Sequence, residues 1–348
     1  MHVGTRSAVC NPGSVTPPDR PTGYFTGVSD EHRAVFGTWA DLCRLGRDAY
    51  FRANVGGFDA NPGTEAAFCK AATLAATWPG GPWPAGGPAE SLHQVGLMLG
   101  NSAAGRLGEL GPLLDAGEVF WSLPGHARGV MEVWARLFRI YTMPFLPQVA
   151  GDVPSPGVIK SMFAAAHREI ISATFSAKKL ADATLAQDPT DTDRQADAAH
   201  VDSELARVVG AYVPHYDPGT TNTSSSRKLA LEGVGEMTTT ALVDAVAAWI
   251  WPDPTNRPPP LYKVFSGHAH SSLDADVQLY RIDDASGRRV LTRELPKNFI
   301  ENNLLTALAV FLRSFARLVE FYGWNKDPLN EFTNRIAELF PGSFEKVT

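Results

Sequence analysis

The sequence predicts an all-α fold, a multi-helix bundle with one small β-hairpin near residues 276–295. Three observations favour this class. Apolar side chains recur at helical spacing in most segments, proline and glycine clusters separate those segments, and strand-like alternation is confined to residues 276–295. The chain has 348 residues, of which 44% are hydrophobic, so it can bury a large core and does not have the composition of a disordered protein.

Residues 1–29 are rich in Pro, Gly, Thr and Ser, and we expect them to form a flexible N-terminal arm. The remainder, 30–348, is predicted to be a single large helical domain with its core in 88–324. Apolar periodicity predicts helices over residues 30–52, 64–77, 88–110, 124–142, 155–184, 191–213, 229–251, 297–322 and 328–339.

Local breakers define the ends of several of these elements. Pro112, which follows Gly111, is expected to interrupt the helix that begins at residue 88, and Gly323 is expected to cap the helix 297–322. An Asp/Ser/Gly turn separates the alternating runs 276–282 and 288–295, which predicts the hairpin.

The densest group of reactive side chains lies in residues 261–273, LYKVFSGHAHSSL, directly after three consecutive prolines that can open a helix. At about 100° per residue, Lys263, Ser266 and His270 share one helical face, whereas His268 lies well round the helix. A cation, a hydroxyl and an imidazole in this alignment could hold a phosphate and move a proton near neutral pH. Alternatively, Ser266 and His270 are a satisfied buried pair that supports helix packing.

A metal site is the second interpretation of the same segment. On a strand, His268 and His270 would point the same way, and Asp274 and Asp276 could complete a set of ligands. On a helix, residues two apart do not face one another. We therefore expect no metal and no cofactor.

A second candidate element is the pair Arg128 and Glu132, four residues apart in the predicted helix 124–142. In the functional interpretation, Arg128 binds an anion and Glu132 orients a partner such as His270 or Lys263. In the alternative, the pair is a surface salt bridge or a buried polar pair between helices.

Other charged residues of the helical segments are expected to be exposed or structural. Arg136 and Arg139 fall on the same helical face as Arg128 and Glu132. A solvated face is expected for three consecutive residues of the helix 155–184, His167, Arg168 and Glu169.

Overall charge and cysteine usage exclude some classes of protein. The net charge of −6 gives no global case for nucleic-acid binding, although a local basic patch is compatible with it. The three cysteines, Cys10, Cys43 and Cys69, show no metal-ligand pairing and make no disulfide framework, so a cytoplasmic location is expected. The longest apolar runs fall far short of the ~20 residues that span a bilayer, so no membrane association is expected.

The order of three motifs resembles a known group of proteins. They are a helix reading ARGVMEVWARLFRIY, then YKVFSGHAH, then a long helix ending in FYGW. The chain is similar over about 88–324 to largely uncharacterised all-helical proteins of actinobacteria, which carry an Arg-x-x-x-Glu helix and a Tyr-Arg-x-x-Ser-x-x-x-His helix. That group in turn resembles HEPN domains, helical modules of RNases in toxin and defence systems.

The resemblance implies metal-independent RNA cleavage, in which Arg–His motifs from two subunits act on the 2′-hydroxyl and the scissile phosphate. Lys263 takes the arginine position and His270 the histidine position, whereas the stricter HEPN spacing selects His268. The chain departs from the motif because a lysine cannot form the bidentate fork of an arginine.

Two functions therefore follow from the sequence. The first is a HEPN-like RNase, with RNA as substrate, a homodimer as the assembly and an unidentified partner protein such as an antitoxin. Its catalytic residues would be His270, Lys263, Ser266 and His268, and Arg128 and Glu132 would support them. The second is a non-catalytic helical binding or regulatory module in which the same polar residues form a buried network.

Overall fold

The structure is a computed structural model that describes residues 30–54, 87–116, 122–146, 155–211, 230–231, 233–235, 237–255, 280–282, 289–291 and 297–341. These ranges are predominantly helical, which confirms the predicted all-α class. The α-helices are α1 (Asp30–Ala53), α3 (Gly87–Asp115), α4 (Ser122–Tyr141), α5 (Pro156–Gln187), α6 (Thr192–Ala211), α7 (Thr239–Ile250), α10 (Lys297–Tyr322) and α11 (Asp327–Leu339). A short 3₁₀ helix, η1 (Met143–Phe145), follows α4. The predicted arm 1–29 and the predicted helix 64–77 lie outside the described residues.

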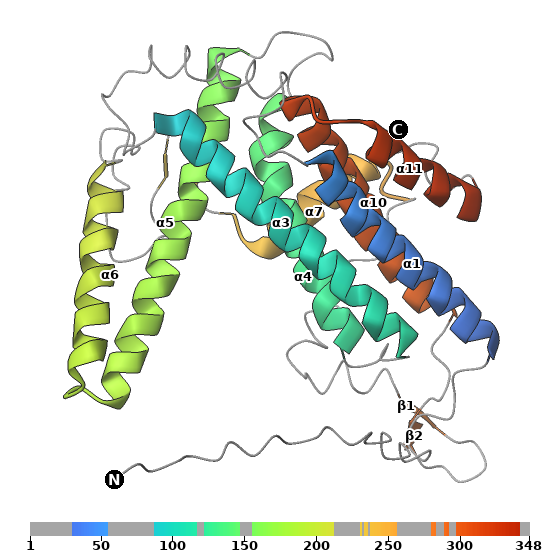
Figure 1. Cartoon of the computed structure of the whole chain (residues 1–348), viewed down its shortest axis with the longest axis horizontal. Coiled ribbons are helices and arrows are strands. Elements are labelled where there is room, and N and C mark those ends of the chain that lie inside the picture. Colours follow the sequence, from blue (N-terminus) through green and yellow to red (C-terminus); the bar gives the residue numbers. More distant parts are fainter. Residues whose placement is uncertain are drawn as a thin grey trace, which may run out of the picture.

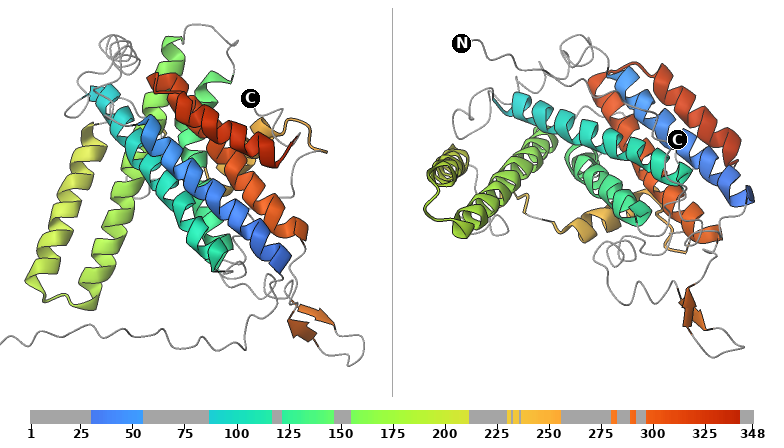
Figure 2. Two further views of the ribbon diagram at one scale, coloured as in Figure 1. Left: turned by 45° about the vertical axis from the view of Figure 1, so that its right-hand side comes forward. Right: turned by 60° about the horizontal axis from the view of Figure 1, so that its bottom comes forward.

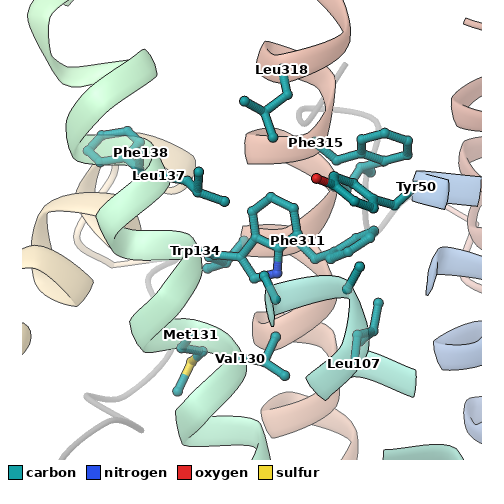
Figure 3. Close-up of a cluster of buried hydrophobic side chains, with 14 of the residues drawn as sticks. Tyr50, Leu107, Val130, Met131, Trp134, Leu137, Phe138, Phe311, Phe315 and Leu318 are labelled. Carbon is teal, nitrogen blue, oxygen red and sulfur yellow. The ribbon is translucent and has the colours of Figure 1, made fainter. Parts of the chain in front are cut away.

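The bundle is organised around α3 and α4, which pack on each other (Figure 1). α1 covers α3, α10 and α7 cover α4, and α11 packs on α1. The main core takes buried side chains from α1, α3, α4, α5, α7, α10 and α11. In its centre, Trp134 of α4 lies among Phe311 and Phe315 of α10 and Tyr50 of α1 (Figure 3). Seven of the described helices therefore share one core.

α5 and α6 form an antiparallel hairpin at one side of the bundle, side by side in both figures of the whole chain (Figures 1 and 2). α5 begins at a capped end, where the Ser155 side chain accepts a hydrogen bond from the N–H of Val158. A second, smaller core is made by residues of both helices and by Leu231 from the segment before α7; its helical members are Ala164, Ile171, Phe175, Val208 and Val209. The hairpin thus has a small core of its own, and α5 joins it to the rest of the bundle.

Of two residues predicted to end or interrupt a helix, Gly323 does so and Pro112 does not. Gly323 has φ 63° and the N–H of Trp324 donates to the carbonyl of Val319 at 3.0 Å, so the predicted C-terminal cap of α10 is confirmed. The predicted interruption at Pro112 is wrong, because α3 continues to Asp115. Proline removes only its own N–H, and the carbonyl of Pro112 still accepts the N–H of Ala116 at 3.0 Å.

The predicted helix 229–251 is also shorter than expected. Leu231 and Val234 pair through two backbone hydrogen bonds of 3.1 and 2.8 Å, and Gly233 between them has φ 80°. This tight turn needs a positive φ that few residues other than glycine adopt, so it cannot be part of a helix. α7 starts only where the Thr238 side chain caps the N–H of Ala241 at 3.2 Å.

The predicted hairpin is confirmed, with short strands. β1 (Tyr280–Ile282) pairs antiparallel with β2 (Arg289–Leu291), and Arg281 lies opposite Val290.

Candidate functional site

Four of the predicted site residues, Lys263, Ser266, His268 and His270, lie outside the described residues, as does the whole segment 256–279. The described residues that precede this segment include α7 and end at Thr255. The site can therefore be built only from its second predicted part, on α4, and from the polar groups packed around it.

Arg128 and Glu132 form the predicted ion pair on α4. The Nε of Arg128 lies 2.7 Å from Oε1 of Glu132, and the two side chains are 20% and 25% exposed. This partial burial places the pair between the two alternatives considered from the sequence, because it is neither a solvated surface bridge nor a fully buried one. The guanidinium carries five N–H donors in a planar fork, a geometry suited to carboxylates and phosphates.

The same face of α4 continues into contacts with neighbouring elements. Nη1 of Arg136 lies 3.7 Å from Oε2 of Glu169 on α5. Arg139, which is 6% exposed, donates a hydrogen bond to the carbonyl of Gly235 in the segment before α7. The polar face of α4 thus meets two other elements of the bundle.

The predicted solvated face of α5 is wrong, because the Glu169 side chain is only 14% exposed and the other two residues are buried. His167 is 0% exposed and Arg168 is 2% exposed. The reason is the position of α5, which is packed on α3, α4 and α6, so that residues 162–168 are buried on every side. The Nδ1 of His167 lies 2.6 Å from the carbonyl of Phe163, and since a carbonyl only accepts, Nδ1 carries the proton.

A cluster of three buried tyrosines forms a second polar feature, which the sequence did not single out. Tyr50 of α1, Tyr141 of α4 and Tyr322 of α10 are 2% exposed or less. The Tyr141 hydroxyl donates to the carbonyl of Leu92 on α3 at 3.0 Å and lies 2.7 Å from the Tyr322 hydroxyl. Because Tyr141 has only one hydroxyl proton, Tyr322 is the donor in their contact. Burial raises the pKa of all three hydroxyls above the ordinary value for tyrosine.

Two glycines of α3 make room for this cluster. A Cβ atom at Gly96 would overlap the Tyr141 hydroxyl oxygen, and a Cβ atom at Gly100 would overlap the Tyr50 hydroxyl oxygen. In each case the Cζ atom of the tyrosine would lie only 2.9 Å from the added carbon. The signal in the sequence is the spacing of four between two glycines inside a helical pattern, which can mark close approach by a neighbouring element.

No protein-family model, curated protein or solved structure matches this chain. Across the described ranges, no helix is long and apolar enough to cross a bilayer. Within those same ranges, no three His, Cys, Asp or Glu side chains gather in a way that could hold a metal ion.

Proposed function

We propose that this protein is a HEPN-like RNase that cleaves RNA without a metal ion. Two features support the proposal: the resemblance of the segment 262–270 to the Tyr-Arg-x-x-Ser-x-x-x-His motif, and the Arg128–Glu132 contact on the helix that carries the second motif. The 2.7 Å contact is the observation that carries it, because a partly buried guanidinium held by a carboxylate is oriented for binding an anion.

In this proposal, His270 removes the proton from a ribose 2′-hydroxyl, whose oxygen attacks the adjacent phosphorus. The bond from phosphorus to the 5′-oxygen breaks, and the leaving oxygen takes up a proton. The products are a 2′,3′-cyclic phosphate and a 5′-hydroxyl end. Lys263 neutralises the phosphate as a point charge, Ser266 orients it, and Arg128 with Glu132 supports the site.

The experiment is incubation of the purified full chain with single-stranded RNA, with and without EDTA, followed by analysis of the product ends. Cleavage is expected to be insensitive to EDTA and to be lost in His270→Ala. His268→Ala tests the alternative spacing, and His200→Ala, at an exposed position on α6, is the matched control. An absence of cleavage, or equal cleavage by all three variants and the wild type, contradicts the proposal.

The α4 pair has its own test. Arg128→Gln and Glu132→Gln are each expected to lower the cleavage rate by about 10-fold to 100-fold, the usual effect of losing a supporting polar partner. The matched controls are Arg317→Gln and Glu320→Gln, another ion pair on a single helix, with N–O distance 2.5 Å. The light-scattering mass of the protein in solution tests the homodimer that the resemblance implies.

The second candidate function is a non-catalytic binding or regulatory module. It is favoured by the polar contacts inside the bundle, namely the hydroxyl contact of Tyr141 with Tyr322 and the hydrogen bond from Arg139 to Gly235. In such a module, His270 would be part of a buried network, and His270→Ala would lower the free energy of unfolding by more than about 1 kcal/mol. An unchanged unfolding midpoint in His270→Ala excludes this role for the histidine.

A further inference from the structure

Gly129 is a buried glycine of α4, and the side chain that lies on it comes from the neighbouring helix α3. A Cβ atom at Gly129 would have three atoms of Arg106 as its nearest neighbours, with Nη1 at 2.6 Å, Cζ at 3.5 Å and Cδ at 3.6 Å. The first of these distances is well inside ordinary van der Waals contact. The lack of a side chain at Gly129 therefore allows the Arg106 guanidinium to lie directly against α4.

The antiparallel packing of α3 and α4 brings Arg106 to this turn (Figure 1). Near the start of α4, Nδ1 of His126 lies 3.4 Å from Oε2 of Glu109, which is near the end of α3. Three residues further along α4 is Gly129, and three residues back along α3 is Arg106. The two contacts are thus successive steps along the same pair of helices.

The turn of α4 beneath Arg106 also carries the Arg128–Glu132 ion pair. Gly129 directly follows Arg128, and it lies three residues before Glu132, a spacing that places the two on one helical face. The Arg106 guanidinium is therefore held beside the ion pair that the proposed function already uses.

The positive charge of Arg106 is not compensated within the part of the chain that the structure describes. The two nearest carboxylates in the sequence of contacts are engaged elsewhere, Glu109 with His126 and Glu132 with Arg128. One turn of α4 thus brings together two guanidinium groups and a single carboxylate. Because Arg106 is exposed, an anion from solution can reach it.

We propose that Arg106 binds a backbone phosphate of RNA beside the Arg128–Glu132 pair, and that Gly129 positions it. The choice of RNA rests on the proposed function. A phosphodiester carries one negative charge on two free oxygens, which the planar fork of a guanidinium can bind together. The phosphate balances the second positive charge of this turn, and Arg106 takes no part in proton transfer.

The test measures binding apart from cleavage. Single-stranded RNA with 2′-O-methyl groups cannot be cut through its 2′-oxygen, and fluorescence anisotropy gives its affinity for the full chain at several salt concentrations. We expect Arg106→Gln and Gly129→Ala each to weaken binding by roughly 10-fold, the effect of one hydrogen-bonded charge. The slope of log affinity against log salt concentration should fall by about 0.7, as for one phosphate contact on a single strand.

α4 offers a matched control for the glycine. Gly125→Ala lies one turn earlier, where a Cβ atom meets nothing within 4 Å, and Lys179→Gln removes a positive charge from an exposed position of α5. Both variants should bind RNA as the wild type does. Gly129→Ala should not lower the thermal unfolding midpoint, because the far end of Arg106 can move aside and alanine favours a helix.

A double variant tests whether Gly129 acts through Arg106. If it does, Arg106→Gln/Gly129→Ala binds RNA no more weakly than Arg106→Gln alone. Losses that add up in the double variant contradict the positioning role of Gly129.

The outcomes also separate this role from the proposed function. If the wild type binds the RNA and Arg106→Gln binds it equally well, the role of Arg106 is overturned even where the wild type cleaves ordinary RNA. Weaker binding by Arg106→Gln and Gly129→Ala, without cleavage of ordinary RNA by the wild type, supports the phosphate site and contradicts the RNase. A wild-type chain that binds no RNA contradicts both.

Discussion

The hydroxyl oxygens of Tyr141 and Tyr322 lie 2.7 Å apart in the core, although 181 positions separate the two residues in the chain. The contact joins the end of α4 to the end of α10, and through the carbonyl of Leu92 it includes α3 as well. Three helices are thus held in one register by two hydroxyl groups.

Removing these hydroxyls should have unequal effects on stability. Tyr141→Phe removes both the hydrogen bond to Leu92 and the contact with the Tyr322 hydroxyl, whereas Tyr322→Phe leaves the hydrogen bond from Tyr141 to Leu92 in place. We expect Tyr141→Phe to lower the free energy of unfolding by about 2–3 kcal/mol and Tyr322→Phe by about 1 kcal/mol. Urea unfolding measures both. Equal losses in the two variants would contradict the direction assigned to the contact.

Gly96 and Gly105 offer a matched pair of substitutions on one helix. Gly96→Ala places a Cβ atom on the Tyr141 hydroxyl, so the two helices must separate or the tyrosine must move, and we expect a loss of about 2 kcal/mol or more. Gly105→Ala meets no atom within 4 Å and should stabilise α3 by up to about 1 kcal/mol, because alanine is the better helix former.

The double variant Gly96→Ala/Tyr141→Phe separates this clash from other effects. Removing the hydroxyl leaves Cζ at 2.9 Å as the nearest atom, so part of the loss caused by Gly96→Ala should be recovered. The recovery is measured from the thermal unfolding midpoints of the wild type, the two single variants and the double variant. If the double variant is as unstable as the sum of the two single variants, the clash with the hydroxyl is not the cause.

Stability should fall on the alkaline side. Burial raises the pKa of the Cys43 thiol to about 12 and raises the pKa of Tyr50, Tyr141 and Tyr322 as well. A raised pKa in the folded state means that the folded protein holds its protons when the unfolded chain has lost them. The stabilisation is complete below the unfolded values, about 8.5 for cysteine and about 10 for tyrosine, and is lost as the pH rises towards the folded values.

The free energy of unfolding is therefore expected to decline from about pH 9 and more steeply above about pH 10, by up to ~1.4 kcal/mol per pH unit for each group. In Cys43→Ala the first part of the decline should disappear. Urea unfolding at several pH values between 7 and 11 measures the free energy of unfolding. If that free energy does not change over this range, these groups are not buried in the folded protein.

The buried guanidinium of Arg168 should be important for folding. Arg168→Ala removes a large side chain that is 2% exposed and leaves a cavity in its packed surroundings, so we expect the free energy of unfolding to fall by about 3 kcal/mol or more. Lys179→Ala, at an exposed position of the same helix, should leave the unfolding midpoint unchanged. Similar midpoints for the two variants would mean that Arg168 is solvated, as its sequence context first suggested.

The Arg128–Glu132 pair can be measured by a double-mutant cycle. With side chains 20% and 25% exposed, the coupling between Arg128→Ala and Glu132→Ala should be about 1 kcal/mol, above that of solvated pairs on helices. The cycle Arg335→Ala with Glu338→Ala on α11, whose side chains are 53% and 64% exposed, is the control and should show a smaller coupling. Equal couplings would mean that the burial of the α4 pair adds nothing.

Helix positions could be predicted from the sequence because their determinants are local. The periodicity of α10 and its cap at Gly323, the start of α5 at Ser155 and the alternation around β1 and β2 all depend on neighbours within a few residues. The errors arose where local signals competed. Pro112 was compatible with a continuing α3, and Gly233 made a turn that apolar spacing alone did not reveal.

Of the candidate site, the ion pair of Arg128 and Glu132 could be predicted because both residues lie on one helix, four apart. The burial of His167 and Arg168 could not, because it depends on which helices surround α5. The tyrosine cluster could not either, since its members come from three helices and its space comes from glycines on a fourth.

By itself the sequence determined that this protein is a helical bundle, where most of its helices end, and which polar residues share a face of α4. Only the tertiary structure decided which polar groups leave water, because amphipathic spacing describes one helix while burial depends on everything packed against it. The contact between Tyr141 and Tyr322 exists because α4 and α10 meet, and no pattern within either helix specifies that meeting.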